Sequence, residues 1–356
     1  MIRTLKSEGK VGQRHLRGIP KRTQKRTYKI LKDRIDTYHY EKYRYANRDH
    51  IMYAIEAQNL RKSFGDVIAV DDVSIAIEEG GIFGFLGPNG AGKTTAIRML
   101  TGVLIPDAGS VFILGTDVDK DPLAAKLKMG VIPENGTVYS DLTAEQNVII
   151  TAKFYGMGRA EREARAEEIL TRLGLIERRN DLVRTFSKGM RQRVSIACAI
   201  IHSPPVLILD EPTTGLDVYS RRLVIDTVRH MNQEGSTVLL TTHNIEEANT
   251  LCTTISIINK GKIVATGSPE KLKKTFDTSR YIEISFDQKV GHELFSLPGI
   301  RQAESWGDKW RVYTDDPDRA VKSLASLAER DHLTIVSIAT SNPTLEEAFV
   351  QLTAGA

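Results

Sequence analysis

The feature that most constrains this chain is a glycine-rich loop between an apolar run and a helix-like run. The loop matches the pattern G-x-x-x-x-G-K-[ST] and consists of Gly87, Pro88, Asn89, Gly90, Ala91, Gly92, Lys93 and Thr94. A phosphate chain is held by several backbone N–H groups that point into one concavity, and glycine permits that close approach. We therefore expect a strand over Ile82–Leu86, a phosphate-binding loop, and a helix from Thr94 whose N-terminus favours anions.

Two side chains of this loop have their own chemistry. Lys93 would place a compact positive charge against the β and γ phosphates, and Thr94 would offer a hydroxyl oxygen to Mg²⁺, a hard cation. The expected contacts of the loop imply a nucleoside triphosphate with its magnesium ion.

A second element is an apolar run that ends in two acids. Its residues are Val206, Leu207, Ile208, Leu209, Asp210 and Glu211. Such a run predicts a buried strand whose carboxylates lie at its carboxyl end, where open α/β sheets bind ligands. Asp210 would hold Mg²⁺ directly or through water, and Glu211 would accept a proton from an attacking water. Alone, a strand and an acidic turn would be the simpler interpretation, but the phosphate loop favours the catalytic one.

Composition excludes several classes of protein. Hydrophobic residues make up 41% and charged residues 26% of the 356 residues, which is typical of globular domains. Two isolated cysteines, Cys198 and Cys252, do not form a disulfide framework or a cysteine-rich zinc module. The apolar run from Val194 to Ile201 is far too short for a membrane span, and we expect neither a span nor a secretory signal.

The N-terminal segment differs from the rest of the chain. Residues 1–51 hold 15 lysines and arginines against 5 acidic residues, whereas the remainder holds 34 basic and 40 acidic residues. Five tyrosines lie between Tyr28 and Tyr45. Basic residues with aromatics could bind nucleic acid or an anionic membrane surface. We favour a disordered extension, or residues translated ahead of a true start at Met52.

The remaining chain predicts an α/β protein with two additions. Residues 52–276 alternate short apolar strands with helices, which favours a parallel-rich sheet covered on its faces. Strands disappear over about 140–199, so we expect a helical subdomain inserted there. Residues 277–356 contain a strand over Tyr281–Phe286, a hairpin arm over 306–314 and a helix over 319–329. We interpret them as a small C-terminal α+β domain.

Further motifs make the chain resemble the ATP-binding cassette (ABC) family. Phe186-Ser187-Lys188-Gly189-Met190 resembles the family's signature motif, and Gly215-Leu216-Asp217 resembles its D-loop. Thr242-His243 is similar to its switch histidine. Phe64 stands where the family stacks an aromatic ring on adenine, and Leu142 to Asn147 opens the helical insertion as in the family. The resemblance covers about residues 53–272.

The resemblance implies a P-loop ATPase with ATP and Mg²⁺ as cofactors. Implied catalytic residues are Lys93, Glu211 and His243, and implied metal ligands are Thr94, Glu134 and Asp210. Outside the glycine-rich loop, implied ATP contacts are Phe64, Thr95, Ser187, Gly189 and Asp217. Lys188 and Met190 replace the signature's commoner glycine and glutamine, and Glu134 replaces the family's glutamine. These variants and the C-terminal domain resemble the drug and sodium exporter branch.

The single loop and single signature imply an assembly. In the family the signature caps a nucleotide on another subunit, so the implied partners are a second ABC ATPase subunit, either identical or a sister cassette, and an integral membrane permease docked near residues 134–141. We expect no specific nucleic acid, and a cytoplasmic location on the inner face of the cell membrane. Two alternatives stay open at this point. The first is a soluble, non-transport ABC ATPase of translation or DNA repair. The second is a nucleotide-binding regulator without turnover, but this alternative is disfavoured by the intact Lys93, Asp210, Glu211 and His243.

Overall fold

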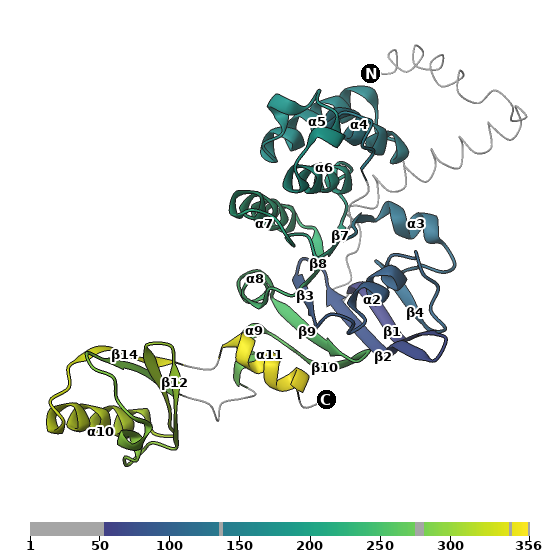
Figure 1. The fold of residues 1–356 in the computed structure, drawn as a ribbon. Helices are drawn as coiled ribbons and strands as arrows, with labels where there is room; N and C mark the ends of the chain where they lie inside the picture. Colours follow the sequence, from purple (N-terminus) through teal and green to yellow (C-terminus); the bar gives the residue numbers. More distant parts are fainter. Residues whose placement is uncertain (1–52, 135–137, 275–280, 342–343, 355–356) are drawn as a thin grey trace, which may run out of the picture. The chain divides into compact units, whose positions relative to one another are not determined.

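The computed structural model describes residues 53–134, 138–274, 281–341 and 344–354 (Figure 1). The basic extension expected over residues 1–51 lies outside the described residues. Among the helices of the described residues, none has the length and apolar character that crossing a membrane requires.

Residues 53–274 form the larger part of the chain, which begins with an antiparallel sheet. Its strand order is β2-β1-β4-β5, with β1 (Tyr53–Phe64) paired to β2 (Val67–Glu78) on one side and to β4 (Ala108–Ile113) on the other. The short β5 (Thr116–Asp117) closes the edge. The sequence analysis did not predict this separate sheet.

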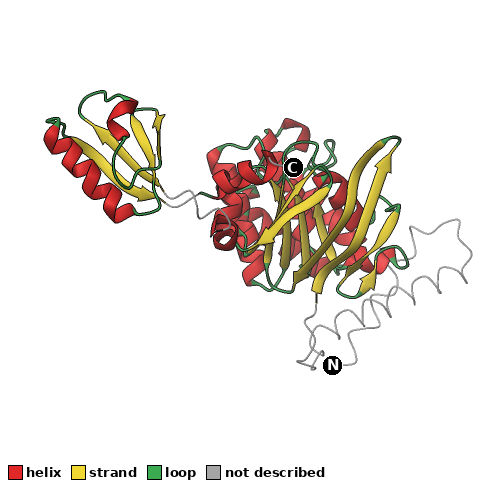
Figure 2. Ribbon diagram, turned by 90° about the horizontal axis from the view of Figure 1, so that it is seen from below, coloured by secondary structure: helices red, strands yellow, loops and turns green. Residues whose placement is uncertain are grey.

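The central sheet is mostly parallel and holds the predicted strands. Figure 2 shows helices packed around the strands of the larger part. Its strand order is β10-β9-β3-β8-β7-β6, and only β10 runs antiparallel to its neighbour. The strands are β3 (Ile82–Leu86), β6 (Met129–Ile132), β7 (Val206–Asp210), β8 (Thr237–Thr242), β9 (Thr254–Asn259) and β10 (Lys262–Gly267). Every residue of β3, β7 and β8 is buried, as expected for parallel strands covered on both faces.

The two faces of this sheet belong to two apolar cores. On one face, Phe85 and Ile208 pack with the antiparallel sheet and with helix α2 (Lys93–Leu100). On the other face, Leu86 and Leu209 pack with helices of the later sequence. The sheet is therefore the middle layer of the larger part.

Helices fill the predicted insertion and connect the strands. The insertion contains α4 (Ala144–Phe154), α5 (Arg159–Arg172), two short 3₁₀ turns (Ile176–Arg178 and Val183–Thr185) and α6 (Lys188–Ile200). Thr143 and Gln146 form a reciprocal capping box at the start of α4. The remaining helices of the larger part are α3 (Pro122–Leu127), α7 (Val218–Gln233), α8 (Ile245–Leu251) and α9 (Pro269–Lys274).

A small antiparallel sheet follows, with strand order β12-β13-β11-β14. Its strands are β11 (Tyr281–Phe286), β12 (Gln302–Trp306), β13 (Lys309–Tyr313) and β14 (Ile335–Ser341), joined by a 3₁₀ turn (His292–Phe295) and helix α10 (Pro317–Arg330). Ile282, Val312 and Leu324 belong to a core of their own. This arrangement has the α+β character that the sequence predicted.

The last helix, α11 (Leu345–Ala354), packs elsewhere than we expected. Leu345 belongs to the same apolar core as Ala248 of α8, and Asn259 of β9 donates its amide to the Thr353 carbonyl at 3.0 Å. The sequence predicts a C-terminal domain over the whole of 277–356, whereas α11 contributes side chains to the core of the larger part. The domain limits themselves stay a prediction.

Candidate functional site

The glycine-rich loop joins β3 to α2, as predicted. Gly90 and Gly92 have left-handed backbone conformations, with φ of 79° and 107°. A Cβ atom on Gly92 would collide with the backbone carbonyl of Ala69. The left-handed backbone and this lack of space both require glycine at position 92. Thr94 and Thr95 are half-buried in the first turn of α2.

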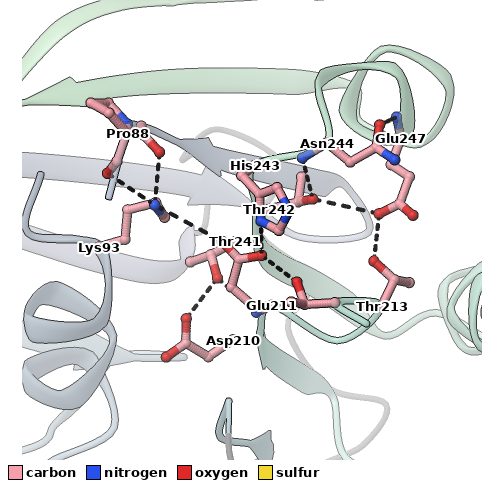
Figure 3. Close-up of polar contacts among 12 residues, drawn as sticks. Pro88, Lys93, Asp210, Glu211, Thr213, Thr241, Thr242, His243, Asn244 and Glu247 are labelled. Atoms are coloured by element: carbon pink, nitrogen blue, oxygen red, sulfur yellow. Dashed lines mark hydrogen bonds and ion pairs between the residues drawn. The ribbon is translucent and has the colours of Figure 1, made fainter. Parts of the chain in front are cut away.

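Lys93 folds back over this loop. Lys93 is 7% exposed, and its Nζ donates hydrogen bonds to the carbonyls of Gly87 at 2.7 Å and Pro88 at 3.2 Å. The same Nζ lies 3.9 Å from Oε1 of Glu211 (Figure 3). The loop and the acidic strand end, which are far apart in the sequence, thus meet at one ammonium group.

The acidic strand end is held by a neighbouring strand. Asp210 is 2% exposed at the end of β7, opposite Thr241 of β8. The Thr241 hydroxyl donates to Oδ1 of Asp210 at 2.7 Å and accepts from the backbone N–H of Glu211 at 2.9 Å. Glu211 itself has a φ of 51°, which is uncommon for a residue with a side chain. One hydroxyl therefore orients the predicted metal ligand and the predicted base.

Glu211 and His243 meet at the carboxyl ends of β7 and β8. Oε2 of Glu211 lies 2.7 Å from Nδ1 of His243 and accepts from the Thr214 hydroxyl at 2.7 Å (Figure 3). The His243 ring is exposed, whereas the Glu211 carboxylate is nearly buried. The three residues implied as catalytic, Lys93, Glu211 and His243, are therefore brought together.

The signature and D-loop residues meet each other. Ser187 caps α6 by accepting from the backbone N–H of Met190 at 3.2 Å. Asp217 caps α7 and accepts from the backbone N–H and the hydroxyl of Ser220, both at 2.8 Å, and the backbone bond is the main reason that the pKa of Asp217 is lowered. A Cβ atom on Gly189 would stand 2.6 Å from the Ser220 hydroxyl. Gly189 thus allows α6 and α7 to approach closely.

Two further predicted residues lie on the surface. Phe64 is 52% exposed at the end of β1, and Nζ of Lys62 stands 5.9 Å from the centre of its ring. Asp107 holds this strand end by accepting from Lys62 at 2.6 Å and from the Ser63 backbone at 2.7 Å. Glu134 is exposed just after β6. An exposed ring at a fixed strand end is suited to stacking on a planar base.

Sequence reasoning missed four residues of this region. Thr241 and Thr214 bond the acidic strand end, and Thr213 donates to Oε2 of Glu247 at 2.7 Å. Their signal was weak, because a threonine in an apolar strand or a turn is ordinary. Only the proximity of Thr241 to His243 in the sequence could have drawn attention to it.

Comparisons with known proteins agree on one family. The family model described as ABC transporter matches residues 70–214, and the model described as the C-terminal domain of DrrA1-3-like ATP-binding proteins matches residues 267–353. The chain is 34% identical over 307 residues to a linearmycin resistance ATP-binding protein of Bacillus subtilis, covering 84% of this chain and 98% of the relative. It is 35% identical over 307 residues to the daunorubicin/doxorubicin resistance ATP-binding protein of Streptomyces peucetius, covering 84% and 92%.

Solved structures show the same likeness. An ATP-binding subunit of an ABC transporter superposes with a TM-score of 0.60 at 30% identity, covering 63% of this chain and 93% of that one. The ATP-binding cassette MJ0796, solved as a dimer in a post-hydrolysis state with ADP and Pi, superposes with a TM-score of 0.56 at 27% identity, covering 60% and 98%.

Proposed function

The chain belongs to the ABC transporter family as an ATP-binding subunit, and from that premise we propose that it powers an exporter through a site shared between two such chains. It is an ATPase whose hydrolysis is coupled to transport, and its fold is the predicted P-loop core with a helical insertion. One observation carries the assignment of the site: Lys93, Glu211 and His243 converge although they come from three separate segments. A non-transport ATPase is not favoured, because relatives that match 84% of the chain are resistance or export proteins.

Catalysis at this site would consist of positioning and charge neutralisation. Glu211 would accept a proton from the attacking water while Thr214 and His243 hold its Oε2. Lys93 would exchange its bonds to the loop carbonyls for the β and γ phosphates. The 3.9 Å between its Nζ and Oε1 of Glu211 is too short to hold a γ-phosphate and a water, so the two side chains would move apart when Mg-ATP binds.

The residues present fit a magnesium ion. Thr94 and Asp210 supply only oxygen donors, which Mg²⁺ prefers, and Asp210 is held in place by Thr241. Among the described residues no group of three or more His, Cys, Asp or Glu could hold a metal ion. Thr94, Asp210 and Glu134 would hold the ion, which would neutralise charge on the phosphates.

The second half of the site would come from another chain. Ser187 lies at the N-terminus of α6, where the helix dipole and unpaired N–H groups favour an anion. Gly189 and Asp217 lie beside it, so one surface would cap the nucleotide of the facing subunit. The dimer of MJ0796 with ADP and Pi supports this arrangement. The partner cassette can be a second copy or a sister chain.

The membrane partner would dock on the helical insertion. Val138, Tyr139, Leu142 and Ile150 line a shallow, open surface pocket that also includes Ser140 and Asp141. Tyr139 is an exposed aromatic side chain there, as expected at a docking surface. The relatives are named for linearmycin, Nod factor and daunorubicin/doxorubicin, so similar ATP-binding proteins are associated with different substrates. We therefore place substrate choice in the membrane subunit, and this chain at the cytoplasmic face of the membrane.

The decisive experiment traps the two-chain site. Glu211→Gln keeps the shape of the base and removes its proton-accepting charge, so hydrolysis should fall about 10²–10⁴-fold while ATP affinity is kept. ATP should then convert a monomer into a dimer on size exclusion. Adding Ser187→Arg should abolish that dimer without loss of bound ATP, because only the capping surface is blocked. Lys93→Ala should instead lose ATP first.

Two results would overturn the proposal. The first is a Glu211→Gln chain that stays monomeric at saturating Mg-ATP while Ser187→Arg hydrolyses ATP at the wild-type rate. The second is a Lys93→Ala chain that binds ATP as tightly as the wild type.

A further inference from the structure

We propose that Glu247 is a positioning residue of the ATPase reaction, which ties together the segments that carry Glu211 and His243. The inference rests on the proposed function, because it assigns a new role within the same reaction. Glu247 is not part of any motif that the sequence analysis identified.

Glu247 is a charged residue in a buried position. It lies in the first turn of α8 and is 7% exposed. The side chain of Asn244 caps this helix by accepting from the backbone N–H of Glu247 at 3.2 Å. The start of α8 is thus fixed directly after His243, and the Glu247 carboxylate is held inside the protein.

One oxygen of this carboxylate joins the ends of two strands. Oε2 accepts from the Thr213 hydroxyl at 2.7 Å and lies 3.5 Å from the Thr242 hydroxyl (Figure 3). Thr213 follows Glu211 by two residues, and Thr242 directly precedes His243. The Thr242 hydroxyl also accepts from the backbone N–H of Asn244 at 2.9 Å. A shift of Glu247 would therefore move both sides of the Glu211–His243 contact.

The other oxygen reaches the helix that follows the D-loop. Oε1 of Glu247 lies 3.5 Å from Nε of Arg221, which belongs to the first turn of α7 after its cap Asp217. Both atoms are buried, and in the part of the chain that the structure describes neither has a hydrogen-bond partner. Their mutual attraction is therefore the interaction that offsets the loss of water around them.

The energetics indicate that this charge is kept for the site. Burying a carboxylate costs free energy, and well-packed apolar side chains often replace a buried ion pair without loss of stability. An apolar residue at position 247 would fill the same face of α8 without the free-energy cost of burying a charge. Such an apolar residue could not interact with Thr213, Thr242 and Arg221 at once. It therefore could not fix the relative positions of the three segments that carry them.

The test separates turnover from nucleotide binding. Glu247→Gln keeps the size of the side chain and removes the charge that pairs with Arg221. Because Glu247 touches neither the phosphate loop nor Phe64, ATP affinity should stay within about twofold, whereas kcat should fall about 10- to 100-fold, as for a small misplacement of reacting groups. Arg221→Met should lower kcat similarly, and the double variant should be no slower than either single one, since the pair acts as a unit.

Glu246→Gln is the matched control, because Glu246 is the preceding residue of the same helix and is exposed. It should keep the wild-type kcat. Each rate is divided by the number of ATP-binding sites measured with a fluorescent ATP analogue, so unfolded protein is not counted. A Glu247→Gln chain with wild-type kcat per bound ATP, or with kcat and affinity lost in parallel, would refute the positioning role. A wild-type chain that fails to hydrolyse Mg-ATP would instead refute the proposed function.

Discussion

Nδ1 of His243 lies 2.7 Å from Oε2 of Glu211, so the exposed histidine and the nearly buried carboxylate form one unit. When Nδ1 carries the proton it donates to the carboxylate, and Nε2 is then left to accept from another group. Thr214 donates to the same oxygen at 2.7 Å. The direction of the Glu211 side chain is thus set from two sides.

Removing the histidine ring should impair turnover more than binding. In His243→Ala, the contact of Glu211 with the ring is lost and its hydrogen bond from the Thr214 hydroxyl remains. The Glu211 carboxylate is then less well oriented, and kcat should fall about 10²-fold. ATP affinity, measured by nucleotide titration, should change little because Lys93 and the loop are untouched. His292→Ala, in the small C-terminal sheet region, is the control and should hydrolyse normally. Wild-type turnover by His243→Ala would contradict this role.

The hydroxyl of Thr241 should be needed for both stability and activity. Thr241→Val keeps the side-chain shape but removes the donor to Asp210 and the acceptor for the Glu211 backbone. The free energy of unfolding, measured in urea, should fall by about 1–3 kcal/mol, and kcat should fall as well. Thr227→Val is a matched control, because that buried hydroxyl bonds only a carbonyl of its own helix, Leu223. Equal losses of activity in both variants would argue against a specific role of Thr241.

Helix α11 should stabilise the larger part of the chain. Leu345 is buried in the main core, so Leu345→Ala should lower the free energy of unfolding by about 2–5 kcal/mol. Val350 lies on the exposed side of the same helix, and Val350→Ala should change it by no more than about 0.5 kcal/mol. Urea unfolding of the full chain measures both. A Leu345→Ala chain as stable as Val350→Ala would show that α11 does not belong to this core.

His202 should make stability depend on pH. Its ring stacks on Tyr155 with centroids 3.5 Å apart, and Nε2 contacts the Met129 carbonyl at 3.2 Å. Burial lowers the pKa of His202 from 6.5 to about 4, so the unfolded chain takes up a proton that the folded chain resists. The contribution to stability is therefore full above pH 6.5 and is lost as pH falls toward 4, by up to about 1.4 kcal/mol per pH unit.

His202→Phe keeps a ring beside Tyr155 and cannot titrate. The difference in free energy of unfolding between this variant and the wild type should be constant above pH 6.5 and should shift in favour of the variant at lower pH. A difference that is flat from pH 7.5 to 4.5 would contradict the assignment.

Deleting the basic residues 1–51 should leave the ATPase rate within about tenfold of the wild type, because every nucleotide motif lies beyond them. The rate of the shortened chain, started at Met52 and compared at equal concentrations of folded protein, measures this. A greater loss would assign the extension a part in hydrolysis.

The sequence alone determined the local parts of this protein. The phosphate loop, the strand before it and the helix after it were predictable, because binding a phosphate chain demands glycine, lysine and a hydroxyl at fixed spacing within one short segment. The strand that ends in Asp210 was also predictable from its apolar run, whereas the catalytic interpretation of Asp210 and Glu211 depended on the phosphate loop elsewhere in the chain. The resemblance to the ABC family then related these segments to one another, because each matches a motif of that family.

Tertiary structure alone decided which distant residues complete them. Thr241 bonds Asp210 across 31 residues of sequence, Thr213 bonds Glu247 across 34, and α11 returns to pack on α8. Periodicity and motifs describe neighbours within a strand, a helix or a loop, so they carry no signal for such contacts. The two hydrogen bonds depend on the parallel pairing of β7 with β8, which brings the ends of these strands together and places Thr241 opposite Asp210.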